Sequence, residues 1–303
     1  MMNPEFIKQL TPLTSICLTN EPMSAHTSFK LGGQVEYFVG AESAGFLKEI
    51  LKLAKEYGVD TYVLGNGSNV LVSDDGIPGL VVSIPDCFTD IRVDGGRISC
   101  GAGVPLKKLC MTALDNSLAG LEFAYGIPGS VGGAVYMDAG AYGGEIRDVL
   151  ESVSYITKEG GEGVLDGADC DLGYRHSVFK DNKDLIITGA VFRLAPGDQA
   201  DIRSKMDELM ERRRSKQPLE YPSAGSTFKR PEGNFAGALI ERTGLKGYTV
   251  GGASVSEKHA GFVINSDRDI CTAKDVKRLI NNVRGAVFAR TGILLEPEVE
   301  FLP

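Results

Sequence analysis

A chain of 303 residues, of which 43% are hydrophobic and 24% charged, can bury a sizeable core and is long enough for two or three domains. A net charge of −8 and a pI near 5.1 oppose nucleic-acid binding, which needs a basic face. No apolar signal region follows the first residues, and no stretch approaches the roughly 18 apolar residues of a membrane span. We therefore expect a cytoplasmic protein with neither nucleic acid nor membrane as partner.

Cysteine usage favours neither a metal site nor a disulfide framework. The six cysteines are scattered singly, with no C-x-x-C pair and no histidine at metal-ligand spacing. We expect reduced thiols in the core and no bound metal. The cysteines are Cys17, Cys87, Cys100, Cys110, Cys170 and Cys271.

The first third of the chain predicts one helix followed by short strands. Apolar residues recur at helical spacing over residues 43–57, with Ser43 as N-cap. Strands are expected at 62–64, 70–72 and 80–84, because these apolar runs are separated by glycine, asparagine and aspartate turns. A hairpin is then expected, with strands 91–93 and 98–100 around Asp94-Gly95-Gly96, and Pro105 opens a short helix.

The remainder alternates strands and helices without a regular βαβ repeat. Strands are expected at 153–157 and 185–194, and a helix from Ile202 to Lys216 collects cations at its end, where they suit the dipole. A second long helix is expected over 273–289. Residues 195–198 read Ala-Pro-Gly-Asp and predict a domain boundary. The pattern is that of an α+β protein.

Two glycine-rich stretches could carry chemistry. In residues 65–69, consecutive backbone N–H groups could form a concave nest for a pyrophosphate; the alternative is a tight turn between two strands. A dinucleotide fingerprint is excluded there, because its third glycine and its following helix are missing. Residues 126–134 hold four glycines, and each loses more backbone entropy on folding than another residue would. A rigid surface that contacts a flat or phosphorylated ligand would be a reason for this cost.

Single polar residues have roles that spacing alone leaves open. The Arg175 guanidinium could bind a carboxylate through two N–H groups, or it could be an ordinary surface cation. His176 has no possible catalytic partner at a recognisable spacing in the sequence. Ser226 lies among small residues and cations, where it could deliver a proton or only support a turn. No G-x-S-x-G elbow surrounds it, which disfavours a hydrolase nucleophile.

The C-terminal stretch alternates charge and bulk. Residues 295–301 read Leu-Glu-Pro-Glu-Val-Glu-Phe and predict a strand with Glu296, Glu298 and Glu300 on one face. The face could be solvated or functional, and spacing does not say which glutamate matters.

Taken in order, these stretches resemble the UDP-N-acetylenolpyruvoylglucosamine reductase (MurB) family. The resemblance spans nearly the whole chain, and the order of the motifs and the length of the central one distinguish it from coincidence. The motifs are HTSFKLGG at 26–33, VLGNGSNVLVSD at 63–74, GLEFAYGIPGSVGGAVYMDAGAYGGEI at 120–146, YRHS at 174–177, QPLEYPSAGSTFKRP at 217–231, LIERTGLKGY at 239–248, HAGFVIN at 259–265 and LEPEVEF at 295–301.

The resemblance implies an α+β architecture with FAD as cofactor. A p-cresol methylhydroxylase-type (VAO-like) FAD-binding fold of two subdomains, 1–84 and 85–200, would precede an α+β substrate-binding domain at 201–293, with the C-terminal strand 294–303 joining the second subdomain. The first glycine stretch would cradle the FAD pyrophosphate, and the second would lie along the ribityl chain and isoalloxazine. The residues concerned are Gly65, Asn66, Gly67, Ser68, Asn69, Gly126, Ile127, Pro128, Gly129, Ser130, Gly132, Gly133 and Ala134.

The resemblance also implies a reaction. The family uses NADPH to reduce UDP-N-acetylglucosamine enolpyruvate to UDP-N-acetylmuramate, a peptidoglycan precursor, with hydride passing from flavin N5 to the enolpyruvyl group. Ser226 would then protonate the α-carbon, while Arg175 and Glu298 would stabilise the enolate, as a fixed guanidinium in a dry site can. We expect a monomer acting on a small molecule. The residues expected to hold the UDP diphosphate and sugar are Lys229, Arg230, Asn234 and His259.

Two departures from the family and two other functions need stating. Asp138 stands where many relatives have Asn, and the short segment before Tyr174 resembles the compact form that lacks a tyrosine-bearing lid loop. An FAD-linked oxidase would need a flavin tether, but His26, His176 and His259 are the only histidines and none lies in a flavin stretch. A non-catalytic flavin- or nucleotide-sugar-binding module would bind flavin without oxidising NADPH.

Overall fold

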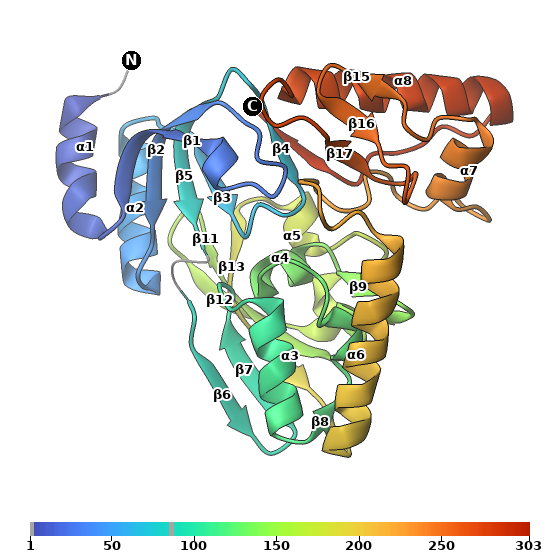
Figure 1. Cartoon of the computed structure of the whole chain (residues 1–303). Coiled ribbons are helices and arrows are strands. Elements are labelled where there is room, and N and C mark those ends of the chain that lie inside the picture. Colours follow the sequence, from blue (N-terminus) through green and yellow to red (C-terminus); the bar gives the residue numbers. More distant parts are fainter. Residues whose placement is uncertain (1–2, 85–87) are drawn as a thin grey trace. The chain divides into compact units, whose positions relative to one another are not determined.

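The computed structural model describes residues 3–84 and 88–303 (Figure 1). Helices mix with mostly antiparallel strands, which confirms the expected α+β class. Cys87 and the residues just after the expected boundary at 84 lie outside the described residues. The chain divides into two compact units, each built from separate stretches. Unit 1 comprises the chain up to Thr19, Glu36–Asn66 and Gly79–Arg212; unit 2 comprises Asn20–Val35, Gly67–Pro78 and Arg213–Pro303.

Unit 1 begins with two packed helices, α1 (Pro4–Leu10) and α2 (Ala44–Glu56). The Phe6 ring of α1 packs edge-on against Tyr37, with 4.9 Å between ring centroids. The Ser43 hydroxyl accepts a backbone N–H from the first turn of α2, so the predicted N-cap is confirmed.

A four-stranded sheet contains two of the three predicted early strands. Within it, β3 and β5 pair in parallel, with Thr61 opposite Leu80. The chain passes from one unit to the other along β1, β2 and β5. The order is β1 (Cys17–Pro22), β2 (Gln34–Gly40), β5 (Ile77–Ser83) and β3 (Thr61–Leu64).

A five-stranded antiparallel sheet dominates the rest of unit 1. The predicted hairpin is confirmed: Asp94 pairs with Arg97 around Gly95, whose φ of +55° favours glycine. The hairpin lies at one edge of the sheet in Figure 1, where it is teal. The order is β12 (Glu162–Asp166), β11 (Leu150–Thr157), β13 (Leu185–Arg193), β7 (Arg97–Gly101) and β6 (Ile91–Asp94).

Short elements complete unit 1 around a single hydrophobic core, in which Leu47, Leu109 and Phe192 are fully buried. Pro105 is the N-cap of α3 rather than its first residue. The helices are α3 (Leu106–Asp115), α4 (Val131–Tyr136), α5 (Val178–Asp181) and α6 (Gln199–Lys216), which runs on into unit 2; the two-stranded pairs are β8 (Leu118–Ala119) with β14 (Ala195–Pro196) and β9 (Gly140–Ala141) with β10 (Gly144–Glu145).

Unit 2 has its own core, under a long helix. In Figure 1, α8 (Ala273–Thr291) lies along the small sheet, and it contacts all three strands. Thr272 and Asp275 form a capping box at its start, which confirms the predicted helix. The sheet has the order β15 (Thr249–Val250), β16 (Ala253–Val255) and β17 (Val263–Asn265), and α7 (Ala236–Arg242) also belongs to the unit.

The C-terminal strand differs from the prediction in length and in partner. Only β18 (Glu300–Leu302) forms a strand, and it pairs in parallel with β4 (Val70–Val72) inside unit 2 instead of joining residues 85–200. The predicted strand is interrupted because Pro297 has no N–H to donate to a ladder. An isolated bridge instead places Pro297 opposite Phe228.

The observed units also divide the chain differently from the three expected segments. Residues 201–212 group with unit 1, whereas 20–35 and 67–78 group with the C-terminal part. The physical reason is the second core, where Phe29 and Leu71 are buried with Val283 and Leu295. In the described part of the chain, no helix is long and apolar enough to cross a bilayer.

Candidate active site

The first glycine stretch is a tightly held loop. Gly67 has a φ of +58°, and a Cβ built on it would lie 2.0 Å from the carbonyl oxygen of His26, so only glycine fits. The Ser28 N–H donates to the Gly67 carbonyl at 3.0 Å, and the Ser28 hydroxyl donates to the Ser223 carbonyl at 2.6 Å. Ser28 therefore connects this loop to the segment that carries Ser226 through its two hydrogen bonds.

The second stretch contains the start of a short helix that the sequence did not predict. Ser130 caps α4, its hydroxyl accepting the Gly133 N–H at 3.4 Å. Gly132 donates to the Ala102 carbonyl at 2.8 Å, and a Cβ on it would approach the Ala102 Cβ to 2.9 Å. Backbone packing against 102–104 therefore holds α4 despite two glycines, each of which costs a helix about 1 kcal/mol.

The two glycine stretches meet within unit 1. A Cβ built on Gly65 would lie 3.0 Å from the Ser130 hydroxyl oxygen, tighter than an ordinary van der Waals contact. A side chain at Gly65 would therefore fit only if the Ser130 hydroxyl shifted. That these two stretches bind FAD stays a prediction.

Arg175 lies at the tip of a two-residue turn in unit 1. Gly173 and His176 pair across the turn, and Arg175 has a φ of +58°, a sparsely populated conformation for a long side chain. Its guanidinium is half-buried, donates to the carbonyls of Asp138 and Gly140, both at 3.4 Å, and lies 5.0 Å from the Tyr174 ring. The cation is therefore oriented by backbone acceptors.

Asp138, which holds Arg175 through its carbonyl, has a fully buried side chain. One carboxyl oxygen accepts the Arg147 N–H at 3.0 Å; the other has no hydrogen-bond partner and lies 3.7 Å from the Arg147 Nε. Burial raises the pKa of the Asp138 carboxyl, and the nearby Glu145 raises it further, against the opposing Arg147 N–H and charge. A second nearby acid, Asp148, acts in the same direction as Glu145.

The backbone segments that carry Ser226 and Glu298 are hydrogen-bonded to each other within unit 2. Ser226 follows Gly225, whose φ is +73°, and precedes Thr227, whose carbonyl accepts the Glu298 N–H at 2.8 Å. The Asn69 side chain donates to the Glu298 carbonyl at 3.1 Å. Sequence reasoning missed the roles of Thr227 and Asn69, because these contacts join residues far apart in the chain.

The four residues expected to bind substrate are all in unit 2, in two environments. Lys229 is paired with Glu296, with 2.5 Å between Nζ and Oε1. Arg230 stacks over the exposed Phe235, which precedes α7, with 4.8 Å to the ring centroid. Asn234 lies in the turn just before α7.

The fourth, His259, lies beside the first turn of the same helix, because a Cβ on Gly237 would be 3.3 Å from its ring. Its Nδ1 accepts the Gly261 N–H at 3.1 Å, which leaves Nε2 to carry the proton. Burial lowers the pKa of His259. The ring is therefore a neutral donor.

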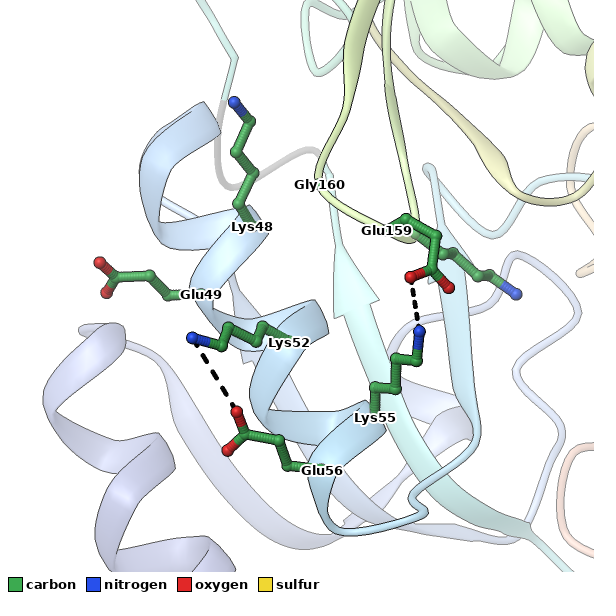
Figure 2. A pocket seen from close by; sticks show the side chains of 8 residues that line it. Lys48, Glu49, Lys52, Lys55, Glu56, Glu159 and Gly160 are labelled. Carbon is green, nitrogen blue, oxygen red and sulfur yellow. Dashed lines mark hydrogen bonds and ion pairs between the residues drawn. The ribbon is translucent and has the colours of Figure 1, made fainter.

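Other polar groups have local partners. His176 lies 3.1 Å from Asp171 and 3.7 Å from Asp181, which supports an ordinary surface role. A surface pocket of about 590 Å³ in unit 1 is lined by lysines and glutamates of α2 and of the β11–β12 turn (Figure 2). Its lysines are paired with carboxylates, so they do not form a free anion site. These pairs are Lys48–Glu162, Lys52–Glu56, Lys55–Glu159 and Lys158–Asp184.

No cluster of three potential metal ligands occurs among residues 3–84 and 88–303. The five cysteines in that part of the chain are free and lie outside both glycine stretches. Arg175, Ser226 and Glu298 remain the predicted catalytic residues.

Two family models match this chain. Residues 35–164 match the FAD binding domain family, and residues 217–302 match the C-terminal domain of UDP-N-acetylenolpyruvoylglucosamine reductase. A UDP-N-acetylenolpyruvoylglucosamine reductase from Lachnoclostridium phytofermentans is 46% identical over 99% of this chain and 98% of its own length. Its counterpart from Clostridium beijerinckii is 49% identical over 91% of this chain and 90% of its own.

Solved structures give the same result. The MurB of Thermus caldophilus has a TM-score of 0.80 at 34% identity, covering 93% of this chain and 97% of its own. An alkyldihydroxyacetonephosphate synthase, at 17% identity and a TM-score of 0.50 over 65% of this chain, shares the fold alone. The expected VAO-like FAD-binding fold with a C-terminal domain is confirmed. On its sequence and its structure, this chain belongs to the UDP-N-acetylenolpyruvoylglucosamine reductase family.

Proposed function

We propose that this protein uses NADPH to reduce UDP-N-acetylglucosamine enolpyruvate to UDP-N-acetylmuramate. The observation that carries the proposal is the bridge in unit 2 where the Glu298 N–H donates to the carbonyl of Thr227, the residue after Ser226. It holds a hydroxyl and a carboxyl on adjacent backbone segments. The names of relatives 46% to 49% identical support the substrate.

FAD, when bound, supplies the hydride for the enolpyruvyl double bond. Ser226 then delivers a proton to the α-carbon. A serine is a weak acid, so it can do this only because the enolate carbon is strongly basic and the hydroxyl is held in place. Gly225, with its positive φ, and the bonded Thr227 supply that constraint.

Arg175 and Glu298 stabilise the charge that develops on the substrate carboxylate. The Arg175 guanidinium is already oriented by two backbone carbonyls, so little reorganisation is needed when charge appears. Glu298, as a protonated acid, donates a hydrogen bond to the enolate from a segment whose backbone is bonded at both its N–H and its carbonyl.

The UDP part of the substrate is held from unit 2. Arg230 and Lys229 supply cations for the diphosphate, and Lys229 must exchange Glu296 for a phosphate oxygen to do so. His259, as a neutral Nε2–H donor, and Asn234 suit sugar hydroxyl or amide groups.

The test is NADPH oxidation by the purified flavoprotein, with and without the enolpyruvyl sugar nucleotide. Substrate-dependent turnover should fall by about 10²-fold or more in Ser226→Ala while FAD stays bound and reducible. Ser266→Ala is the matched control, since the Ser266 hydroxyl bonds only the Gly252 backbone. A wild-type protein that binds flavin without substrate-dependent turnover would instead be a flavin-binding module.

We also propose a monomer that works in the cytoplasm. Both statements follow from the resemblance to the family. Sedimentation velocity of the FAD-loaded protein tests the first, and fractionation of cells that express it tests the second. A dimer that is stable at micromolar concentration would overturn the monomer.

A further inference from the structure

Thr227 is fully buried, and all three of its polar groups make hydrogen bonds of 2.8 Å. Its N–H donates to the Gly261 carbonyl, its carbonyl accepts the Glu298 N–H, and its hydroxyl oxygen accepts the Val263 N–H. Val263 is itself buried, with 1% exposure.

These bonds attach Thr227 to a rigid element on one side and to a reactive segment on the other. Val263 is the first residue of β17 and pairs with Val255 of β16. The helix α8 packs against both strands. On the other side, Ser226 precedes Thr227 directly, and Glu298 is bonded to its carbonyl. A displacement of residue 227 would therefore move Ser226 and Glu298 together.

We propose that Thr227 is a positioning residue for the reduction, its hydroxyl anchoring the Ser226 hydroxyl and the Glu298 backbone to β17. The assignment rests on the proposed function, because it assumes that Ser226 delivers the proton. Proton transfer from a weak acid depends steeply on distance, so the anchor acts on the rate of protonation. Flavin reduction by NADPH does not use the Ser226 proton, so this step serves as the internal reference.

The kinetic test separates the two half-reactions by rapid mixing. In Thr227→Val, which conserves volume but removes the acceptor, oxidation of the reduced flavin by substrate should slow on the order of 10–100-fold. Flavin reduction by NADPH and the KM for NADPH should not change, and the solvent isotope effect should rise as proton transfer limits the rate. Thr227→Ser, which keeps the oxygen, should restore most of the rate.

Thr243→Val is the matched control. It is the same chemical change at a residue of unit 2 whose hydroxyl donates to the Leu239 carbonyl at the end of α7. It should leave both half-reactions and the isotope effect as in wild type. A Thr243→Val variant as slow as Thr227→Val would mean that any loosening of unit 2 lowers the rate, and would overturn a specific role for Thr227.

Amide hydrogen exchange gives a readout that does not need activity. Thr227→Val should lose protection at Val263 and at Glu298 together, while Thr227→Ser and Thr243→Val keep it. Unchanged protection at Glu298 in Thr227→Val, or a rate loss in Thr227→Ser as large as in Thr227→Val, overturns the anchor. Absence of turnover in the wild-type protein would overturn the proposed function instead. The exchange experiment would still test the Thr227 anchor independently.

Discussion

The side-chain amide of Asn69 donates to the backbone carbonyl of Glu298 at 3.1 Å, and the Asn69 carbonyl accepts the Glu300 N–H at 2.9 Å. The end of the glycine loop and the glutamate segment are thus bonded by both side chain and backbone. The parallel pairing of β4 and β18 continues this connection, with Val70 opposite Glu300. The loop expected to hold FAD therefore shares its support with the glutamate expected to act on the substrate.

Asn69→Ala should weaken FAD binding and slow substrate reduction in the same variant. The lost hydrogen bond is expected to lower the free energy of unfolding by about 1 kcal/mol. FAD titration of the apoprotein and rapid-mixing kinetics measure the two effects. A variant that loses only FAD affinity would contradict a shared support.

Gly67→Ala should be far more destabilising than Gly58→Ala. Both glycines have a positive φ, +58° and +64°, so both variants bear the left-handed strain of about 1–2 kcal/mol. At Gly67 the new methyl also meets the His26 carbonyl, whereas at Gly58 nothing lies within 4 Å, so we expect an additional ~1–3 kcal/mol. Urea unfolding of both variants gives the difference; equal values would contradict the close packing.

Asp138→Asn should stabilise the protein, and more so as pH rises. Burial raises the folded-state pKa of Asp138, so the folded protein binds this proton more tightly than the unfolded chain. Stability is therefore lost as pH rises from the ordinary carboxyl range through the folded pKa, and the penalty is complete above it. Asn keeps the oxygen that accepts the Arg147 N–H and removes the charge.

Thermal unfolding at acid and at mildly alkaline pH checks this prediction. The gain in Tm should be larger at alkaline pH, about 2–4 °C for each kcal/mol removed. Asp115→Asn, at an exposed site, is the control and should show no such trend. A gain that is equal at both pH values would mean that the charge of Asp138 is not the cause.

Arg175→Lys should lower kcat/KM for the enolpyruvyl substrate by about 10²–10³-fold and leave flavin reduction by NADPH intact. Lysine keeps the charge but not the fork that two backbone carbonyls orient. His176→Gln is the neighbouring control and should have little effect, since His176 faces surface aspartates. Equal losses in both variants would point to the turn rather than the guanidinium.

The buried thiols should resist labelling in the folded protein. Burial raises the pKa of Cys100, Cys110 and Cys271 to about 12, and of Cys170 to about 11, so almost no thiolate exists near neutral pH. Alkylation followed by peptide mass mapping should find these four unmodified before denaturation and modified after it. Rapid native labelling of any of them would contradict the packing.

Local patterns predicted the elements whose reasons are local. The helices α2 and α8 follow from apolar spacing behind Ser43 and Thr272, and the hairpin at Gly95 follows from its turn residues. The helix α4 could not be predicted in this way, because its glycines oppose a helix and its support comes from Ala102. The alternation of residues around Pro297 favoured a strand. Pro297 has no N–H to donate, however, and the strand begins only at Glu300.

The candidate site was predictable as a set of residues and not as an arrangement. Motifs singled out Ser226, Arg175 and Glu298, but no periodicity reports that Thr227 is bonded to Val263 or that Asn69 is bonded to Glu298. Such bonds depend on which backbone segments lie side by side. For the same reason the sequence did not predict that each unit is built from separate stretches of the chain.

That discontinuity has a consequence for biosynthesis. The core of unit 2 buries Phe29 and Leu71 with Leu295 and Val299, so its first residues leave the ribosome on the order of 10–50 s before its last, at about 5–20 residues per second. Unit 2 can close only after Leu295 and Val299 have left the ribosome. The C-terminal stretch 217–302, expressed alone, would lack part of its own core and should aggregate unless the early segments are supplied in trans.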